Sequence, residues 1–205
     1  MVEHQLRARG ITDSRVLAVM EKVPRHLFVP ESDIARAYDD HAMPIGAGQT
    51  ISQPYMVAVM TECLALTGFE RVLEVGTGSG YQAAVLAELC AEVYTIERVE
   101  SLAERTRERL ANLGYHNVHI VVGDGTLGLP DHAPYQGILV TAGAPKIANA
   151  WVRQLEEGGR VVVPVGDRWS QQLICATKTA GKMHQEKICG CVFVPLVGKD
   201  GWPGD

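Results

Sequence analysis

The sequence predicts an α/β fold, namely a doubly wound, mostly parallel sheet of seven strands with a terminal antiparallel hairpin and an N-terminal helical extension. Apolar strand-like runs alternate with helix-forming stretches between residues 72 and 166, which is the pattern of β–α–β units. The run at 160–166 contains Val-Val-Val-Pro-Val, as expected for a strand buried on both faces. The last two runs, 171–179 and 187–197, are separated only by a short glycine-containing segment and therefore predict a hairpin.

The N-terminal extension is expected to contain two helices with a long loop between them. Thr12-Asp13 is a good N-cap for the first helix, and Pro24 stops it. The segment 25–49 is rich in proline, glycine and charge, and a structureless stretch of that length in a compact domain is usually functional. The second helix is expected over 55–66. The apolar stripe of the first helix consists of Val16, Leu17, Met20 and Val23.

Ser52, just before the second helix, allows two interpretations. It is a good N-cap residue, and Pro54 suits a first helical turn, so its hydroxyl could simply cap the helix. A helix N-terminus with free amides and a hydroxyl also binds anions, so a substrate carboxylate could dock at the same place. The composition of this segment favours the cap without excluding the second interpretation.

The remaining strands and helices follow from composition and periodicity. In order, they are a strand ending near residue 75, a helix at 81–90, a strand at 92–97, a helix at 99–113 stopped by Gly114, strands at 117–122 and 135–141, and a helix at 146–157 closed by Gly158-Gly159.

Residues 72–80 read Val-Leu-Glu-Val-Gly-Thr-Gly-Ser-Gly, an apolar strand followed by three glycines at alternate positions. After a buried strand, such a loop lets backbone amides approach a ligand at the start of the next helix, although turns also use glycine. Tyr81 stands where a dinucleotide fingerprint has its last glycine. Glu74 would repel a pyrophosphate but suits a cationic, amino-acid-bearing ligand such as S-adenosylmethionine. The predicted cofactor-binding residues of this segment are Glu74, Gly76, Thr77, Gly78, Ser79 and Gly80.

Two further acids end neighbouring strands. Glu97 lies at the end of the next strand, where an acid reaches the ribose hydroxyls of a bound nucleoside, although a solvated strand end is the simpler alternative. Asp124, within Gly123-Asp-Gly125, is placed to accept from an adenine amino group, but the same tripeptide is ordinary turn chemistry. Because ligands bind beyond the carboxyl ends of parallel strands, Glu74, Glu97 and Asp124 are expected at one edge of the sheet.

Bulk properties indicate one enzyme-sized domain, 1–205, in which residues 1–66 precede a cofactor-binding core at 67–205. The net charge is −5 and no basic stripe is present, which argues against nucleic acid as the main partner. Five cysteines, an odd number, fit free thiols in a reducing cytoplasm, and Cys189-x-Cys191 lacks the second pair of a zinc site, so no metal is expected. Because the first residues, through Arg9, are charged and polar and no apolar run is long enough to cross a membrane, neither a signal peptide nor a membrane-spanning segment is expected.

In its motifs the chain resembles the protein-L-isoaspartate O-methyltransferase family. The motifs are Gly-Gln-Thr-Ile-Ser-Gln-Pro at 48–54, Leu-Glu-Val-Gly-Thr-Gly-Ser-Gly-Tyr-Gln at 73–82, the Gly-Asp-Gly at 123–125 and a closing Phe-Val-Pro-Leu at 193–196. They span essentially the whole chain in order, and Thr50-Ile51-Ser52 is particular to this family, whereas the glycine loop is common to many S-adenosylmethionine enzymes.

The resemblance implies a fold of the S-adenosylmethionine-dependent methyltransferase type. It also implies an enzyme that methylates the abnormal carboxylate of L-isoaspartyl residues in damaged proteins and peptides, with S-adenosyl-L-homocysteine as the other product. A monomer is expected. Residues carried over from the family are Ser52 as the active-site residue, Thr50 and Ile51 as the substrate loop, and Glu97, Arg98, Asp124, Gly125 and Gln172 around the cofactor.

Three functions compete at this stage. A carboxyl methyltransferase needs no general base, because a carboxylate is already ionised at neutral pH. A small-molecule or amine methyltransferase on the same fold would need a polar amine-binding motif after the 135–141 strand, where the chain reads Thr141-Ala-Gly-Ala-Pro145. The third candidate is a nucleotide-binding module without catalysis, since fold does not prove function.

Overall fold

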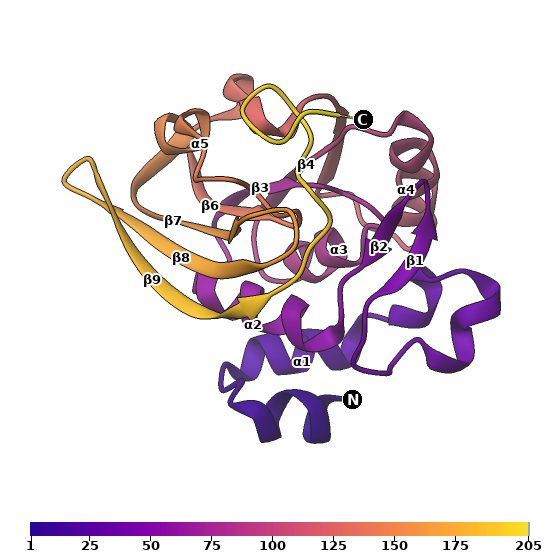
Figure 1. Ribbon diagram of the computed structural model, residues 1–205. Coiled ribbons are helices and arrows are strands. Elements are labelled where there is room, and N and C mark those ends of the chain that lie inside the picture. Colours follow the sequence, from indigo (N-terminus) through magenta and orange to yellow (C-terminus); the bar gives the residue numbers. More distant parts are fainter. Residues whose placement is uncertain (205) are drawn as a thin grey trace.

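The computed structural model describes residues 1–204. At its centre lies a seven-stranded sheet in the order β5-β4-β3-β6-β7-β8-β9 (Figure 1). The five strands from β5 to β7 run parallel, and β8 is antiparallel to both of its neighbours. The predicted α/β fold with a terminal hairpin is therefore confirmed. The strands are β3 (Arg71–Val75), β4 (Glu92–Glu97), β5 (Val118–Val122), β6 (Tyr135–Val140), β7 (Leu155–Gly166), β8 (Gln171–Thr179) and β9 (Lys182–Cys191).

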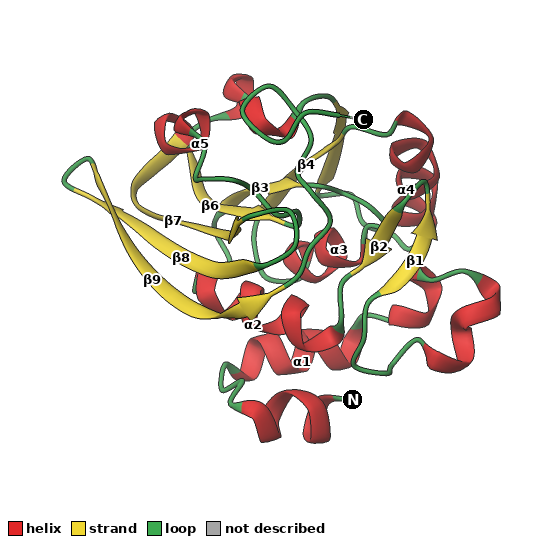
Figure 2. Cartoon of the chain, in the orientation of Figure 1, coloured by secondary structure: helices red, strands yellow, loops and turns green. Residues whose placement is uncertain are grey.

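Helices cover both faces of this sheet (Figure 2). Successive residues of β3 point to opposite faces, because side chains alternate along a strand. Val72 thus joins a core cluster that includes residues of α2, α3 and α4, whereas Leu73 and Val75 join a second cluster with Trp151 of α5. The helices are α1 (Ser14–Lys22), α2 (Pro54–Leu64), α3 (Tyr81–Ala87), α4 (Glu100–Asn112) and α5 (Asn149–Gln154). None of the helices in residues 1–204 is both long and apolar enough to span a bilayer.

The N-terminal extension packs on the α2 side of the sheet (Figure 1). The side chain of Asp13 caps α1 as predicted, accepting hydrogen bonds from the amides of Arg15 and Val16. The segment expected to lack regular structure instead forms short helices and a small hairpin, because the buried side chains Phe28 and Met43 anchor it to the core. Besides α1, the elements before α2 are η1 (Val2–Leu6), η2 (Arg7–Arg9), η3 (Arg25–Phe28), η4 (Glu31–Arg36), β1 (Met43–Gly46) and β2 (Gln49–Ile51).

Two predicted boundaries near the C-terminus are wrong. The helix expected over 146–157 is only α5, and β7 already begins at Leu155, which pairs with Tyr135 through an irregular register. The last strand was expected at 187–197, but β9 spans Lys182–Cys191. The hairpin turns at Ala180-Gly181, both with positive φ, so pairing starts at Lys182, and the chain leaves the sheet after Cys191. That departure leads residues 194–197 towards the carboxyl ends of the parallel strands.

The order of the strands in the sheet reverses between β3 and β6. From β3, the chain adds β4 and β5 on one side and β6 and β7 on the other. In open α/β sheets a crevice forms where the strand order reverses, beyond the carboxyl ends of the strands.

Candidate active site

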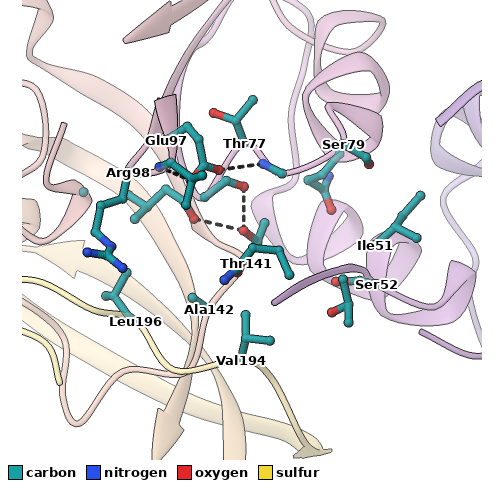
Figure 3. A pocket seen from close by; sticks show the side chains of 18 of the residues that line it. Ile51, Ser52, Thr77, Ser79, Glu97, Arg98, Thr141, Ala142, Val194 and Leu196 are labelled. Atoms are coloured by element: carbon teal, nitrogen blue, oxygen red, sulfur yellow. Dashed lines mark hydrogen bonds between the residues drawn. The ribbon is translucent and has the colours of Figure 1, made fainter. Parts of the chain in front are cut away.

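A cavity lies at this reversal point, beyond the carboxyl ends of β3, β4 and β6 (Figure 3). Val57, Tyr81, Gln82 and Gly125 contribute to its wall, and the rest comes from five parts of the chain. They are the loop after β3 at 75–79, the end of β4 at 96–99, residues 141–142 after β6, the segment 194–197 after β9, and residues 49–52 in and after β2. The cavity therefore joins the predicted cofactor loop to the predicted substrate loop.

The glycine loop has a backbone that side chains would not permit. Gly76 has φ +98°, and a Cβ there would lie 2.3 Å from Thr141 Oγ1. The Thr141 hydroxyl lies 2.7 Å from the carbonyl oxygen of Gly76 and so holds this turn close to β6. Thr77, Gly78 and Ser79, three of the residues predicted to bind the cofactor, line the cavity, whereas Gly80 does not. At Gly80 a Cβ would lie 2.6 Å from Thr106 Cγ2, so this glycine permits close packing of α4 instead.

Glu97 lies in the cavity wall and is 6% exposed (Figure 3). Its two carboxylate oxygens accept hydrogen bonds of 2.9 Å from the amides of Gly78 and Val99. An ionised carboxylate has about four acceptor positions, so these two bonds leave capacity for a ligand hydroxyl. The carboxylate thus braces the glycine loop and can bind a diol at the same time. Arg98, beside it, also lines the cavity and is exposed.

Glu74 does not line the cavity but lies fully buried beneath the glycine loop. One carboxyl oxygen accepts a hydrogen bond from Thr95, whose hydroxyl is also 2.7 Å from that of Thr77, and the other oxygen has no partner within residues 1–204. Burial raises the pKa of Glu74 to about 8, with the nearby Glu97 adding to the rise and the Thr95 bond opposing it. Glu74 is therefore mostly protonated at neutral pH, which removes the charge expected to attract a cationic ligand.

The raised pKa of Glu74 predicts a pH dependence of stability that Glu74→Gln removes. The unfolded carboxyl has a pKa of about 4.3, so between pH 5 and 8 the folded chain keeps a proton that unfolding releases. This contribution is complete below the unfolded pKa and is lost as pH rises through the folded one. Urea unfolding of both proteins from pH 5 to 8 should show wild type losing about 1 kcal/mol per pH unit relative to Glu74→Gln. If the difference between the two free energies of unfolding does not change with pH, Glu74 is not a neutral carboxyl in the folded protein.

The residues predicted around the adenine are only partly in the wall. Gly125 lines the cavity, but the Asp124 carboxylate binds Thr126 and the amide of Lys199, at 2.8 Å, instead. Burial alone would raise the pKa of Asp124, yet these hydrogen bonds lower it. Asp124 thus ties the C-terminal segment to the β5 end.

Gln172 is exposed on β8 and does not line the cavity. The neighbouring Gln171 is buried, and its side chain accepts a 2.8 Å hydrogen bond from the amide of Phe193 while donating to the carbonyl of Asp167. A shift of one residue along a strand moves a side chain to the other face. Gln171 therefore anchors the chain immediately before residues 194–197, and the role assigned to Gln172 is not supported by its position.

Thr50, Ile51 and Ser52 all line the cavity. Ile51 and Ser52 lie across from Thr141 and Val194 (Figure 3). The prediction that Ser52 caps the second helix is wrong, because the N-cap of α2 is Gln53 and no side chain at that position caps it. Within the described residues the Ser52 hydroxyl makes no hydrogen bond, so it is free to bind a ligand.

Sequence reasoning missed part of the wall. Thr141 and Ala142, and residues 194–197, were not assigned to the site. The only feature of the sequence that pointed to residues 194–197 was the Phe-Val-Pro-Leu motif at 193–196. Across residues 1–204, no group of three or more His, Cys, Asp or Glu side chains is placed to hold a metal ion.

Comparison with known proteins agrees with this geometry. The family model for protein-L-isoaspartate(D-aspartate) O-methyltransferase matches residues 1–201. The protein-L-isoaspartate O-methyltransferase of Methanoculleus marisnigri is 55% identical over 100% of this chain and 93% of its own. Protein-L-isoaspartate O-methyltransferase 1 of Syntrophobacter fumaroxidans is 57% identical over 100% of this chain and 95% of its own.

Two solved structures share the fold. One, a protein-L-isoaspartate O-methyltransferase, has a TM-score of 0.85 at 29% identity over 98% of this chain and 67% of that chain. The other is a Plasmodium falciparum chain described as a protein-L-isoaspartate O-methyltransferase in complex with S-adenosyl-L-homocysteine, with a TM-score of 0.81 at 26% identity over 96% of both chains. With a matched family model and relatives above 50% identity over its full length, the chain belongs to the protein-L-isoaspartate O-methyltransferase family.

Proposed function

We propose that this protein transfers the methyl group of S-adenosylmethionine to the free carboxylate of L-isoaspartyl residues in proteins and peptides. The product is a methyl ester, which can close to a succinimide and so begin repair. The observation that carries the proposal is that Ser52 and its neighbours, the glycine loop and Glu97 all line one cavity.

The cavity wall fits the cofactor. Glu97 has acceptor capacity for the two ribose hydroxyls. Gly76 and Gly78 line the cavity and carry no side chain that would separate a ligand from the loop backbone. When bound, S-adenosylmethionine supplies an electrophilic methyl group on a sulfonium. Apolar residues such as Leu196 and Val194 line the opposite wall and exclude water from the reacting charges.

The acceptor side requires positioning rather than proton transfer. A substrate carboxylate is ionised well below neutral pH, so the chain has no proton to remove. The free Ser52 hydroxyl can donate a hydrogen bond to one carboxylate oxygen and orient the other for in-line attack. An amine methyltransferase would instead need a polar amine-binding motif after β6, where the chain reads Thr141-Ala-Gly-Ala-Pro145 and the Thr141 hydroxyl donates to backbone carbonyls of the glycine loop.

Methyl transfer to paired peptides tests the activity. The two peptides have one sequence and differ only in an aspartyl or an isoaspartyl linkage, and labelled S-adenosylmethionine reports transfer. Transfer to the isoaspartyl peptide alone is expected. Equal labelling of both peptides, or labelling of small amines but neither peptide, would support the alternative methyltransferase. Cofactor binding without transfer to any acceptor would support a binding module.

The rate is expected to rise as the substrate carboxylate ionises and then to stay flat through neutral pH. A bell-shaped profile of kcat/KM would instead report an essential acid and base on the enzyme. His41 is the histidine nearest to Ser52 in the sequence and would be the candidate for such a base, but it lies outside the cavity wall, with its ring nitrogen 2.9 Å from a guanidinium nitrogen of Arg36. His41→Gln should therefore leave the profile unchanged between pH 6 and 9. A bell-shaped profile in wild type that becomes flat in His41→Gln would refute the mechanism without a general base.

A further inference from the structure

The first turn of α2 follows directly on the cavity segment that contains Ser52. A helix N-terminus leaves backbone amides without intrahelical partners. Pro54, the first helical residue, has no amide hydrogen, so Tyr55 carries one of the first free amides. Neither Ser52 nor the N-cap residue Gln53 satisfies it with a side chain.

Asp40, from the distant segment before β1, takes this role. One of its carboxylate oxygens accepts a 3.0 Å hydrogen bond from the Tyr55 amide, and the other accepts a 3.1 Å bond from the side-chain amide of Gln53. Asp40 thus holds both the first turn of α2 and the residue next to Ser52. An acid at this end is also favoured by the helix dipole.

Asp40 is itself fixed by Arg9. The Arg9 guanidinium forms an ion pair with the Asp40 carboxylate, whose side chain is 20% exposed. The same guanidinium lies over the ring of Tyr55, with its central carbon 3.5 Å from the ring centroid. Three separate segments of the chain therefore meet at the first turn of α2, directly after the substrate loop, and hold the end of that loop in one position.

We propose that Asp40 is a positioning residue for the methyl acceptor: by capping α2 in place of Ser52, it keeps the Ser52 hydroxyl free and directed into the cavity. Serine beside a helix start otherwise bonds the free amides, which would withdraw its hydroxyl from a substrate. The inference rests on the proposed function, because it assigns Asp40 an effect on the peptide substrate and none on the cofactor.

Asp40→Ala should lower kcat/KM for an isoaspartyl peptide by about 10- to 100-fold while the Kd for the cofactor product S-adenosyl-L-homocysteine stays within about twofold. Asp40→Asn keeps an acceptor oxygen for Tyr55 and should recover most of the activity. Asp13→Ala is the matched control, because it removes the side-chain cap of α1, away from the cavity, and leaves the substrate loop untouched. All kinetics are run well below the melting temperature of each variant.

A double-mutant cycle separates positioning from a general loss of structure. If Asp40 acts through Ser52, then Asp40→Ala should cost less than about threefold in a Ser52→Ala background. Full additivity, equal losses in Asp40→Ala and Asp13→Ala, or a loss of cofactor affinity matching the loss of activity would each overturn the proposal.

Hydrogen exchange at the Tyr55 amide provides a readout that needs no substrate. Asp40→Ala should make this amide exchange faster. If the Ser52 hydroxyl instead becomes its acceptor, the amide stays protected in Asp40→Ala and exchanges faster in the double variant Asp40→Ala/Ser52→Ala. Unchanged exchange in both variants would refute the capping role. Absence of methyl transfer in wild type, with the exchange result intact, would instead refute the proposed function and leave the cap in place.

Discussion

Glu97→Ala is expected to weaken binding of S-adenosylmethionine by about 1.5–3 kcal/mol, or roughly 10- to 150-fold in Kd. Two losses combine in this variant. The carboxylate no longer accepts from ligand hydroxyls, and the amides of Gly78 and Val99 lose their partners, which loosens the loop that must surround the cofactor. Titration calorimetry with S-adenosyl-L-homocysteine on purified protein measures the change directly.

Two further variants show whether this effect is specific. Glu104→Ala removes an exposed carboxylate from α4 and should leave Kd within about twofold, because it changes charge without touching the cavity. Glu97→Gln keeps one acceptor oxygen and should fall between wild type and alanine. If all three variants bind like wild type, then Glu97 has no part in holding the cofactor.

Ser52→Ala is expected to lower kcat/KM on isoaspartyl peptide by about 10- to 100-fold, the usual range for losing one hydrogen bond to a charged group. Stability should change by less than about 0.5 kcal/mol, because the hydroxyl caps no helix and makes no hydrogen bond within residues 1–204. Cofactor affinity should be unchanged. Steady-state kinetics, thermal melting and calorimetry on the same preparation distinguish these effects.

The alternative for Ser52 has a different signature. A helix cap lost at this position would destabilise the fold by about 1 kcal/mol and leave the rate per folded molecule near normal. Asp13→Ala is expected to show that pattern, because the Asp13 side chain caps α1 with two hydrogen bonds and lies outside the cavity wall. A Ser52→Ala variant that behaves like Asp13→Ala would remove Ser52 from the reaction.

The sheet, the glycine loop and the position of Glu97 could be predicted from the amino-acid sequence. These features depend on local patterns: strand and helix periodicity, a valine run that fills β7, and glycines whose positive φ other residues rarely adopt. A parallel α/β sheet then brings the strand ends together without further information. The motif that contains Ser52 was likewise readable from a few adjacent residues.

Which side chains contact one another could be seen only in the folded structure. Asp40 caps α2 from 15 residues away, Gln171 rather than Gln172 anchors the C-terminal wall, and Glu74 is buried under the loop with a raised pKa. Each outcome depends on which segments converge in space, on side-chain direction within one strand, or on the loss of solvent around a carboxyl. None of these outcomes depends only on a residue and its neighbours in the sequence, so no local sequence pattern could predict them.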